Sequence, residues 1–176
     1  MLKNSNQRYG LITRCLHWLI ALTIITQIII AIVMENINGP LTRDLYSVHK
    51  SLGLTLLLLG VLFVVWRFFN KRPALPNGLP LWQRYAANLV QFSLYCLILI
   101  MPLSGWFMST AAGYAPSFWG WFTVAAPIEH SKAVASFFGL VHEVCAWALG
   151  VLIIIHILAV LKHVLINKDG VLKQML

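Results

Sequence analysis

Four stretches of this chain are apolar enough and long enough to cross a lipid bilayer as helices. They run approximately over residues 14–34, 49–69, 85–108 and 137–161. A bilayer core about 30 Å thick requires about 20 predominantly apolar residues in a helix. Of the 176 residues, 60% are hydrophobic and only 10% are charged, a balance that excludes an ordinary soluble domain. We therefore predict an all-α integral membrane protein built as a four-transmembrane-helix bundle.

The segments between these predicted helices carry residues that favour turns. The first holds Asn38, Gly39 and Pro40, the second holds Pro73, Pro76, Asn77, Gly78 and Pro80, and the third holds Gly113, Pro116, Gly120 and Pro127. We predict one domain over residues 1–176, in which the third connection, rich in Trp and Phe, lies along the membrane surface. The first apolar run is too long for a signal-peptide core and lacks a small-residue cleavage site, so we expect it to be retained.

The cationic side chains are distributed unequally over the two ends of the predicted bundle. An even number of crossings puts both termini on one side, where ten of the thirteen Lys and Arg gather: Lys3, Arg8, Arg14, Arg67, Lys71, Arg72, Arg84, Lys162, Lys168 and Lys173. The other side has Arg43, Lys50 and Lys132, together with Glu35, Asp44, Glu129 and Glu143. The positive-inside rule predicts that both termini are cytoplasmic. The net charge of +8 therefore reflects membrane topology and does not indicate nucleic-acid binding.

Four histidines, His17, His49, His142 and His156, lie near the ends of the predicted helices. Ionisable side chains in spanning helices are costly and are functional candidates. The topology places His17 and His156 near the cytoplasmic side. It places His49, at the start of the second helix, and His142 near the outer side. Depth alone therefore pairs His17 with His156 and His49 with His142. His156 follows His142 by 14 positions. In a helix this step is a rotation within about 40° of a whole number of turns and a rise of roughly 21 Å. Both rings should therefore face the same bundle interior.

Two histidine pairs at different depths predict haem iron rather than zinc. Zinc prefers a compact tetrahedral cluster, which pairs separated by a membrane thickness cannot form. Haem iron accepts two axial histidines, so each pair would hold one haem. Cys15, Cys96 and Cys145 form no C-x-x-C-H motif, so two noncovalent b-type haems are predicted. On these residues alone, a small transporter with proton-relaying histidines and a set of hydrogen-bonded structural histidines remain the alternatives.

Small residues near the predicted ligands are expected to leave room for a porphyrin. Gly53 and Gly139 each lie one helical turn from a predicted ligand and are assigned to cofactor binding. Glycines at these positions would also suit helix contacts in a membrane without any cofactor. Among the seven tryptophans, Trp106 and Trp147 are the expected haem neighbours.

Several short motifs together carry a family resemblance. They are Arg8-Tyr9-Gly10 before His17-Trp18, His49-Lys50-Ser51, His142-Glu143 with His156, and Lys162-His163 before Lys168-Asp169 and Leu172. In this combination the chain resembles the bacterial cytochrome b561 family over essentially its whole length. The resemblance implies a four-helix, di-haem protein of the inner membrane, related to the cytochrome b subunits of hydrogenases and formate dehydrogenases. It also implies ligands on the first, second and fourth helices.

The resemblance further implies electron exchange with a membrane quinone such as ubiquinone. One activity associated with the family is the oxidation of superoxide outside, coupled to reduction of ubiquinone in the membrane. Three cations against four acids make the outer side of this chain slightly negative, which disfavours steering of the superoxide anion. A second interpretation is a membrane cytochrome b subunit that relays electrons for a partner dehydrogenase or a periplasmic redox protein.

We expect a quinone site at the cytoplasmic end, formed by His163, Lys162 and Arg14. His163 lies seven residues beyond His156 and so on nearly the same helix face. A histidine there could deliver a proton as an electron arrives. Each residue also has a simpler interpretation, because His163 could bind water or a lipid phosphate and Lys162 could be a topological anchor.

Overall fold

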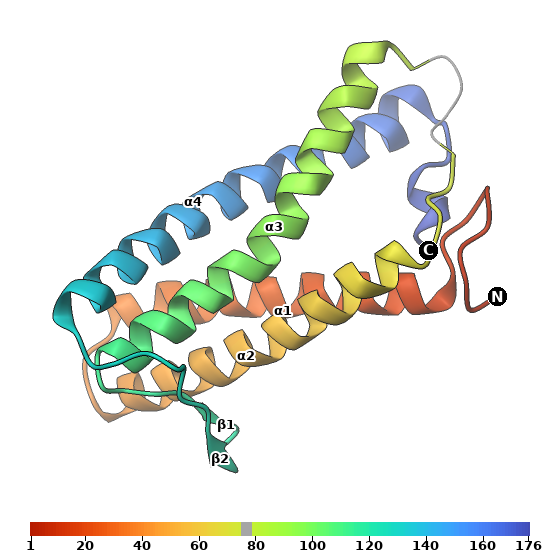
Figure 1. Ribbon diagram of the computed structural model, residues 1–176. Coiled ribbons are helices and arrows are strands. Elements are labelled where there is room, and N and C mark those ends of the chain that lie inside the picture. Colours follow the sequence, from red (N-terminus) through yellow and green to blue (C-terminus); the bar gives the residue numbers. More distant parts are fainter. Residues whose placement is uncertain (75–78) are drawn as a thin grey trace.

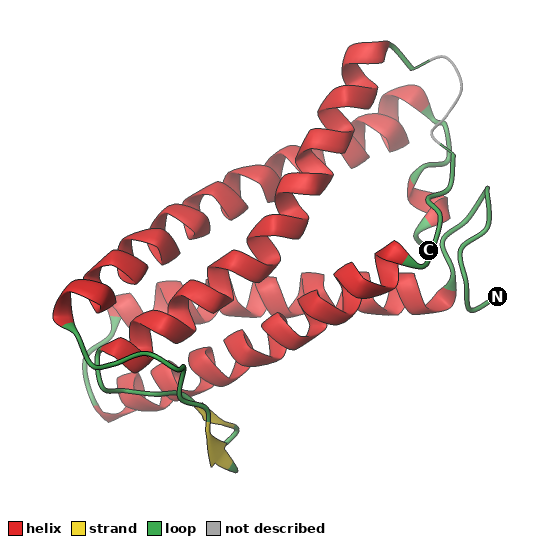
Figure 2. Ribbon diagram, viewed as in Figure 1, coloured by secondary structure: helices red, strands yellow, loops and turns green. Residues whose placement is uncertain are grey.

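The computed structural model describes residues 1–74 and 79–176, and four long helices dominate it (Figure 1). The helices are α1 Leu11–Asn36, α2 Pro40–Phe68, α3 Leu81–Ala111 and α4 Lys132–Lys162. Strands β1 Ser117–Phe118 and β2 Phe122–Thr123 form a hairpin between α3 and α4, and the π-helical η1 His163–Asn167 and 3-10 helical η2 Leu172–Gln174 follow α4 (Figure 2). All four helices are long and apolar enough to cross a membrane, which confirms the predicted bundle. The predicted turn residues Pro76, Asn77 and Gly78 lie outside the described residues.

Each helix extends beyond the apolar run that predicted it, because polar turns continue the helix past the membrane core. Helix α2 begins at Pro40, whose fixed φ and missing N–H suit the first helical position. His49 therefore lies nine residues into α2 and not at its start, as the sequence had suggested. Helix α4 begins after Ser131, whose side-chain oxygen accepts a 3.4 Å hydrogen bond from the N–H of Val134.

The four helices pack in the order α1, α2, α3 and α4, with an open seam between the first and the last. Consecutive helices lie side by side, whereas α1 and α4 hardly touch (Figure 1). Both chain termini lie at one end of the bundle, which we call the terminal end, and the β-hairpin lies at the other, the hairpin end. Toward the hairpin end, residues of both α1 and α4, among them Ile28 and Ala146, line a cavity.

Helices α2 and α3 approach closely where α3 contains a proline. Pro102 has no N–H to donate to the carbonyl of Ile98 one turn earlier. Gly60 of α2 faces this carbonyl, and a β-carbon there would lie 3.2 Å from the Ile98 oxygen. Gly60 thus serves helix packing.

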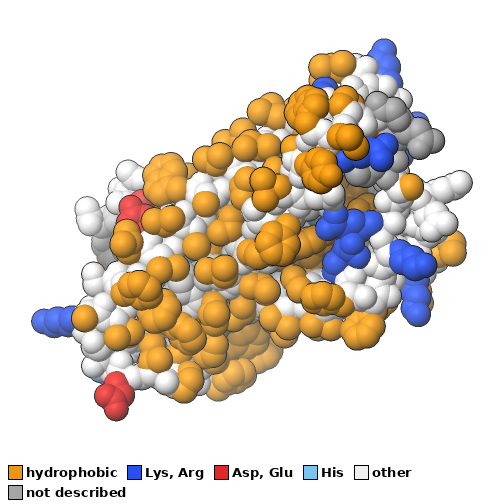
Figure 3. All heavy atoms as spheres, turned by 45° about the horizontal axis from the view of Figure 1, so that its top comes forward, with side chains coloured by type: hydrophobic (Ala, Val, Ile, Leu, Met, Phe, Trp, Pro, Cys, Tyr) orange, Lys and Arg blue, Asp and Glu red, His pale blue; other side chains and the backbone are white. Residues whose placement is uncertain are grey.

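The centre of the bundle is an apolar layer midway between the two ends. Leu56 of α2 and Leu149 of α4 are only 1% and 2% exposed, and they pack with Ile20, Ile24, Phe63 and Ile98. Large apolar side chains also cover the outside of the molecule (Figure 3). An apolar exterior around an apolar centre is the pattern of a protein whose solvent is lipid.

The third connection is a hairpin attached to α2, where the sequence had suggested only a segment lying along the membrane. Ser51, 2% exposed, donates its hydroxyl to the Ser117 carbonyl at 2.9 Å and accepts the Trp119 N–H at 3.3 Å. The indole N–H of Trp119 donates to Thr55 Oγ1 at 3.1 Å. These bonds fix the hairpin two residues along α2 from His49.

The two chain ends hold each other at the terminal end. The Tyr9 N–H donates to the Gln174 carbonyl at 3.1 Å, and the Trp18 indole N–H donates to the Met175 carbonyl at 3.2 Å. The C-terminal segment is therefore tied to α1 beside His17, which neighbours Trp18 in the chain.

Candidate functional site

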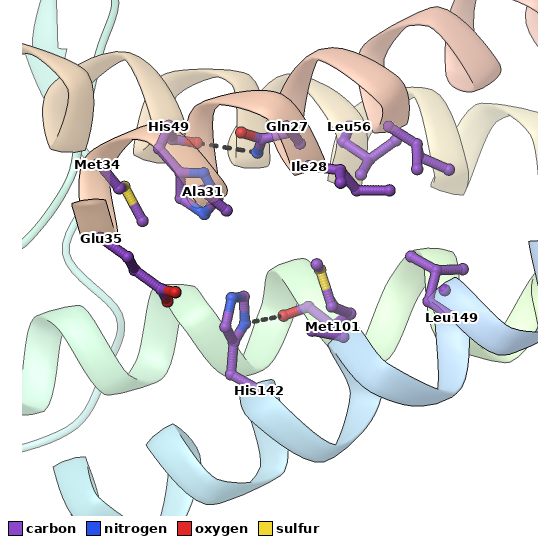
Figure 4. A pocket seen from close by; sticks show the side chains of 13 residues that line it. Gln27, Ile28, Ala31, Met34, Glu35, His49, Leu56, Met101, His142 and Leu149 are labelled. Atoms are coloured by element: carbon purple, nitrogen blue, oxygen red, sulfur yellow. Dashed lines mark hydrogen bonds between the residues drawn. The ribbon is translucent and has the colours of Figure 1, made fainter. Parts of the chain in front are cut away.

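The structure brings the four helix histidines together as two facing pairs. At the hairpin end, the ring centres of His49 on α2 and His142 on α4 are 6.4 Å apart, and the rings point toward one another across a cavity (Figure 4). At the terminal end, the ring centres of His17 on α1 and His156 on α4 are 6.3 Å apart. These are the pairs that depth along the membrane had suggested.

The ring of His142 is held in one orientation by α3. Its Nδ1 lies 2.8 Å from the carbonyl oxygen of Met101, and the hydroxyl of Ser104 donates to the same oxygen at 2.7 Å. Because a carbonyl can only accept, Nδ1 of His142 carries the proton of this bond, which leaves Nε2 as the ring nitrogen that could bind a metal. Hydrogen bonding of one ring nitrogen to a backbone carbonyl is how metal-binding histidines are usually oriented.

His49 is held through its backbone instead. The side-chain amide of Gln27 on α1 donates from Nε2 to the His49 carbonyl at 3.0 Å. The Nδ1 atom of His49 is buried and has no hydrogen-bond partner among the described residues. The two imidazoles of this pair therefore enter the cavity with different support.

The cavity at the hairpin end extends to both sides of the His49–His142 axis. One lobe, with a cavity volume of about 150 Å³, lies toward the bundle centre and reaches Leu56, Leu149 and Gly150. The other, of about 250 Å³, lies between α2 and α3 and reaches Gly53, Trp106 and Pro116. Both include Gln27, Met34, Glu35, His49, Met101 and His142. A mostly apolar lining with a few convergent polar groups is typical of cofactor sites.

Both pairs have the spacing that one metal ion between two imidazoles requires. Two rings on opposite sides of an ion, each with a metal–nitrogen bond of about 2 Å and a ring centre roughly 1 Å farther back, have centres about 6 Å apart. Among the described residues, no group of three or more His, Cys, Asp or Glu side chains could hold a metal ion. The other ligands would have to come from a macrocycle, so the donor set fits haem iron and does not fit zinc.

The glycines predicted to make room for the cofactor have different surroundings. Gly53 lines the larger lobe and lies beside Gln27, with a virtual β-carbon 3.4 Å from Nε2 of that amide. Gly139 lies instead against Met108 of α3, 3.3 Å from its sulfur, so it packs α4 on α3. The geometry thus gives Gly139 a role in helix packing, which the one-turn spacing to a histidine could not distinguish from cofactor binding.

Sequence reasoning missed the contribution of α3, which has no histidine. A β-carbon at Gly105 would lie 2.8 Å from Cε1 of His142, so only glycine leaves space for this ring. Trp106 lines the cavity as expected, with its indole N–H donating to the Val124 carbonyl at 2.7 Å. Trp147 is 75% exposed and lines neither lobe of the cavity, so its place beside a cofactor stays a prediction.

The residues expected to form a quinone site do not form one cluster. His163, in η1, places Nδ1 2.5 Å from Oδ2 of Asp169. Lys162 points elsewhere, with its ammonium 5.9 Å from the ring centre of Trp82. Within the described residues, no hydrogen bond or ion pair joins the Arg14 side chain to His163, and the Nε of Arg14 is buried without a partner.

Asp169 is the strongest partner of His163 and was not identified as such from the sequence. Partial burial alone raises the pKa of Asp169, but hydrogen bonds from His163 and from the Val171 N–H outweigh it, so the net pKa is lowered. The carboxylate can therefore accept the Nδ1 proton of His163 and leave Nε2 of the ring available. The left-handed turn that brings Asp169 back to His163 passes through Lys168 and Gly170, with φ of 51° and 77°.

Comparisons with known proteins agree with this geometry. Residues 8–176 match the family model described as prokaryotic cytochrome b561. The chain is also 35% identical over 176 residues to a protein of Escherichia coli (strain K12) named cytochrome b561 homolog 2, covering 98% of this chain and 93% of that protein.

Proposed function

The chain belongs to the prokaryotic cytochrome b561 family, which transfers electrons across the membrane by b-type haem, and on this premise we propose that it binds two haems. One haem would lie between His17 and His156 and the other between His49 and His142. The observation that supports this most directly is the ring separation of 6.3 and 6.4 Å in two pairs that share helix α4. When bound, haem iron supplies a one-electron redox couple.

The histidines determine how electrons enter and leave such a protein. If both histidines of a pair hold the same haem, no ligand position would remain for oxygen, and the group would supply one-electron transfer to a reaction partner. This arrangement favours electron transfer over oxygen activation. The Met101 carbonyl supports the same role, because it fixes Nε2 of His142 as the ligating atom.

An apolar layer lies between the two histidine pairs and would separate the movement of electrons from that of protons. Leu149 lies seven residues from each histidine of α4, and Leu56 faces the same layer from α2. Both side chains are essentially inaccessible, and the described residues that pack around them are apolar. Electrons would pass from one haem to the other across this layer, and each end would exchange its own protons.

We propose that a membrane quinone such as ubiquinone exchanges electrons and protons at the terminal end, near His163. Conversion of a quinone to a quinol takes two electrons and two protons. The His163–Asp169 pair, at 2.5 Å, supports a role for this ring in moving those protons, because the carboxylate orients the ring and an imidazole can pass protons. Lys162 and Arg14 enter the proposal only as nearby cations, since no contact joins either side chain to His163 among the described residues.

We further propose that the terminal end faces the cytoplasm of a bacterium whose inner membrane holds the protein. The unequal distribution of Lys and Arg supports this orientation. At the opposite end, Lys50 donates to the Tyr114 carbonyl at 3.0 Å and lies over the Tyr114 ring, so it is already engaged. This arrangement weakens the case for superoxide as the outer substrate and favours a redox protein or a second quinone there.

The first test is an absorption spectrum of the purified chain in detergent. We expect reduced-minus-oxidised bands of b-type haem and, after extraction as the pyridine haemochrome, two haems per chain. A colourless protein would exclude the proposal and would favour a proton-relaying transporter.

The quinone proposal is tested by the kinetics of His163→Ala. Reoxidation of the reduced protein by a soluble ubiquinone analogue should be slower in this variant while both haems remain. Asp169→Asn should have a smaller effect in the same direction, and His130→Ala, in the loop at the hairpin end, should match the wild type. Loss of a haem in His163→Ala would identify a ligand, and unchanged kinetics would exclude His163. A fully loaded wild type that does not react with the quinone would favour a subunit that relays electrons for a partner dehydrogenase.

A further inference from the structure

Gln27 is a polar residue buried in the middle of the predicted first spanning helix. It is 5% exposed, and the next residues on its face toward the bundle are Ile20 and Ile24. An amide in such surroundings is costly unless both its N–H and its carbonyl groups find partners. A leucine would pack there without that cost, so the amide calls for an explanation.

The nitrogen of the Gln27 amide has a hydrogen-bond partner, but its oxygen has none. Its Nε2 donates to the backbone carbonyl of His49 at 3.0 Å, and the absence of a side chain at Gly53 allows this approach. Its Oε1 is buried without a partner, and among the described residues it is the single buried side-chain oxygen in that condition. The buried Nδ1 of His49 also lacks a partner. An unpaired acceptor and an unpaired ring nitrogen therefore occur on two residues that are already hydrogen-bonded to each other.

His142, which faces His49 across the cavity, has a ring hydrogen bond that His49 lacks. His142 donates from Nδ1 to the Met101 carbonyl at 2.8 Å, which fixes its ring and leaves Nε2 free. Metal-binding histidines almost always donate the second ring N–H to such an acceptor, and this bond raises the basicity of the ligating nitrogen. On the α1 side of the cavity, the side-chain acceptors that line the same space are the exposed Glu35 carboxylate and Gln27 Oε1, of which Gln27 Oε1 is buried without a partner (Figure 4).

We propose that Gln27 is a positioning residue for His49, with its amide oxygen accepting the Nδ1–H of His49 while its amide nitrogen remains on the His49 carbonyl. One side chain would then fix both the backbone and the ring of the ligand. This inference rests on the proposed haem between His49 and His142. It makes the hydrogen bond to Gln27 the counterpart of the His142–Met101 bond and a determinant of the reduction potential at the hairpin end.

The test compares the redox titration of Gln27→Met with that of the wild type. Methionine has similar length and apolar volume but no amide, so packing is kept and both hydrogen bonds are removed. Without the acceptor, His49 becomes a weaker donor to the oxidised iron, so the midpoint potential of one haem should rise while that of the other is unchanged. We also expect the affinity for that haem to fall roughly 10-fold or more, measured by transfer of haem to apomyoglobin.

Two further variants separate this role from general effects on α1. Gln27→Glu keeps an acceptor at the same reach but cannot donate to the His49 carbonyl, so the potential should fall from that of Gln27→Met to the wild-type value or below it. Thr26→Val removes a polar group that bonds only the Leu22 carbonyl of its own helix, and it should leave both potentials unaltered. If the wild type holds two haems and Gln27→Met changes neither potential nor haem affinity, the role of Gln27 is refuted and the two-haem proposal stands. A wild type without haem at His49 and His142 refutes the two-haem proposal itself.

Discussion

The ring of His142 on α4 lies directly against the backbone of Gly105 on α3, so closely that a β-carbon at Gly105 would come within 2.8 Å of Cε1. Helix α3 therefore contributes to the site by the absence of a side chain and by the Met101 carbonyl that orients the same ring. A helix without any histidine thus determines where one ligand of the hairpin-end pair can lie.

Gly105→Val should displace His142 and eliminate haem binding at the hairpin end. The branched side chain cannot share space with the ring, and a clash of this kind typically costs about 1–3 kcal/mol. Haem content should fall from two to about one per chain. Gly139→Ala is the matched control on α4, because its β-carbon meets the flexible thioether of Met108 at 3.3 Å, which can move aside. Full haem content in Gly105→Val would show that the ring does not need its observed position.

Substitution of the paired histidines should remove one haem at a time. Either His49→Ala or His142→Ala should abolish the haem of the hairpin end, and either His17→Ala or His156→Ala should abolish that of the terminal end. Reduced spectra and redox titrations distinguish the two haems. His130→Ala, at a loop histidine beside Gly113, should retain both. Loss of the same haem from the His49 and His156 variants would contradict the pairing.

A reporter fused after Leu176 should be active in the cytoplasm, and one inserted after Gly120 should be active outside. Ten Lys and Arg at the terminal end against three at the other drive this orientation during insertion. Gly120 suits the insertion because it forms the hairpin turn, with φ of 79° and nothing within 4 Å of a virtual β-carbon. Opposite activities would reverse which haem faces the cytoplasm without affecting the number of haems.

Asp169 should stabilise the C-terminal segment at neutral pH but not in acid. Its pKa is lowered in the folded protein, so the stabilisation is present above the ordinary carboxyl value and is lost as the pH falls through the lowered pKa. Asp169→Asn should therefore lower the midpoint of thermal unfolding at pH 7, and its difference from the wild type should shrink below about pH 4. Lys173→Ala serves as a control in the same segment. A difference between Asp169→Asn and wild type that is independent of pH would assign the effect to packing alone.

Much of the architecture follows from local patterns along the chain. A helix that crosses lipid must satisfy its own backbone hydrogen bonds and present apolar side chains, so long apolar runs reveal the number of helices. The ends of the helices were harder to predict from the sequence, because polar turns such as those around Arg43 and Asp44 continue α2 outside the apolar run. The depth of His17, His49, His142 and His156 followed from helix count and direction alone.

The sequence by itself determined the class of protein, the four spans and which histidines share a level, because these depend on hydrophobicity and on the helical repeat. Tertiary structure alone decided which side chains support those histidines. The contacts of Met101 and Gly105 with His142, of Gln27 with His49 and of Asp169 with His163 join separate helices or cross a turn. Such contacts depend on how helices are rotated and how closely they approach, which no spacing along one segment encodes.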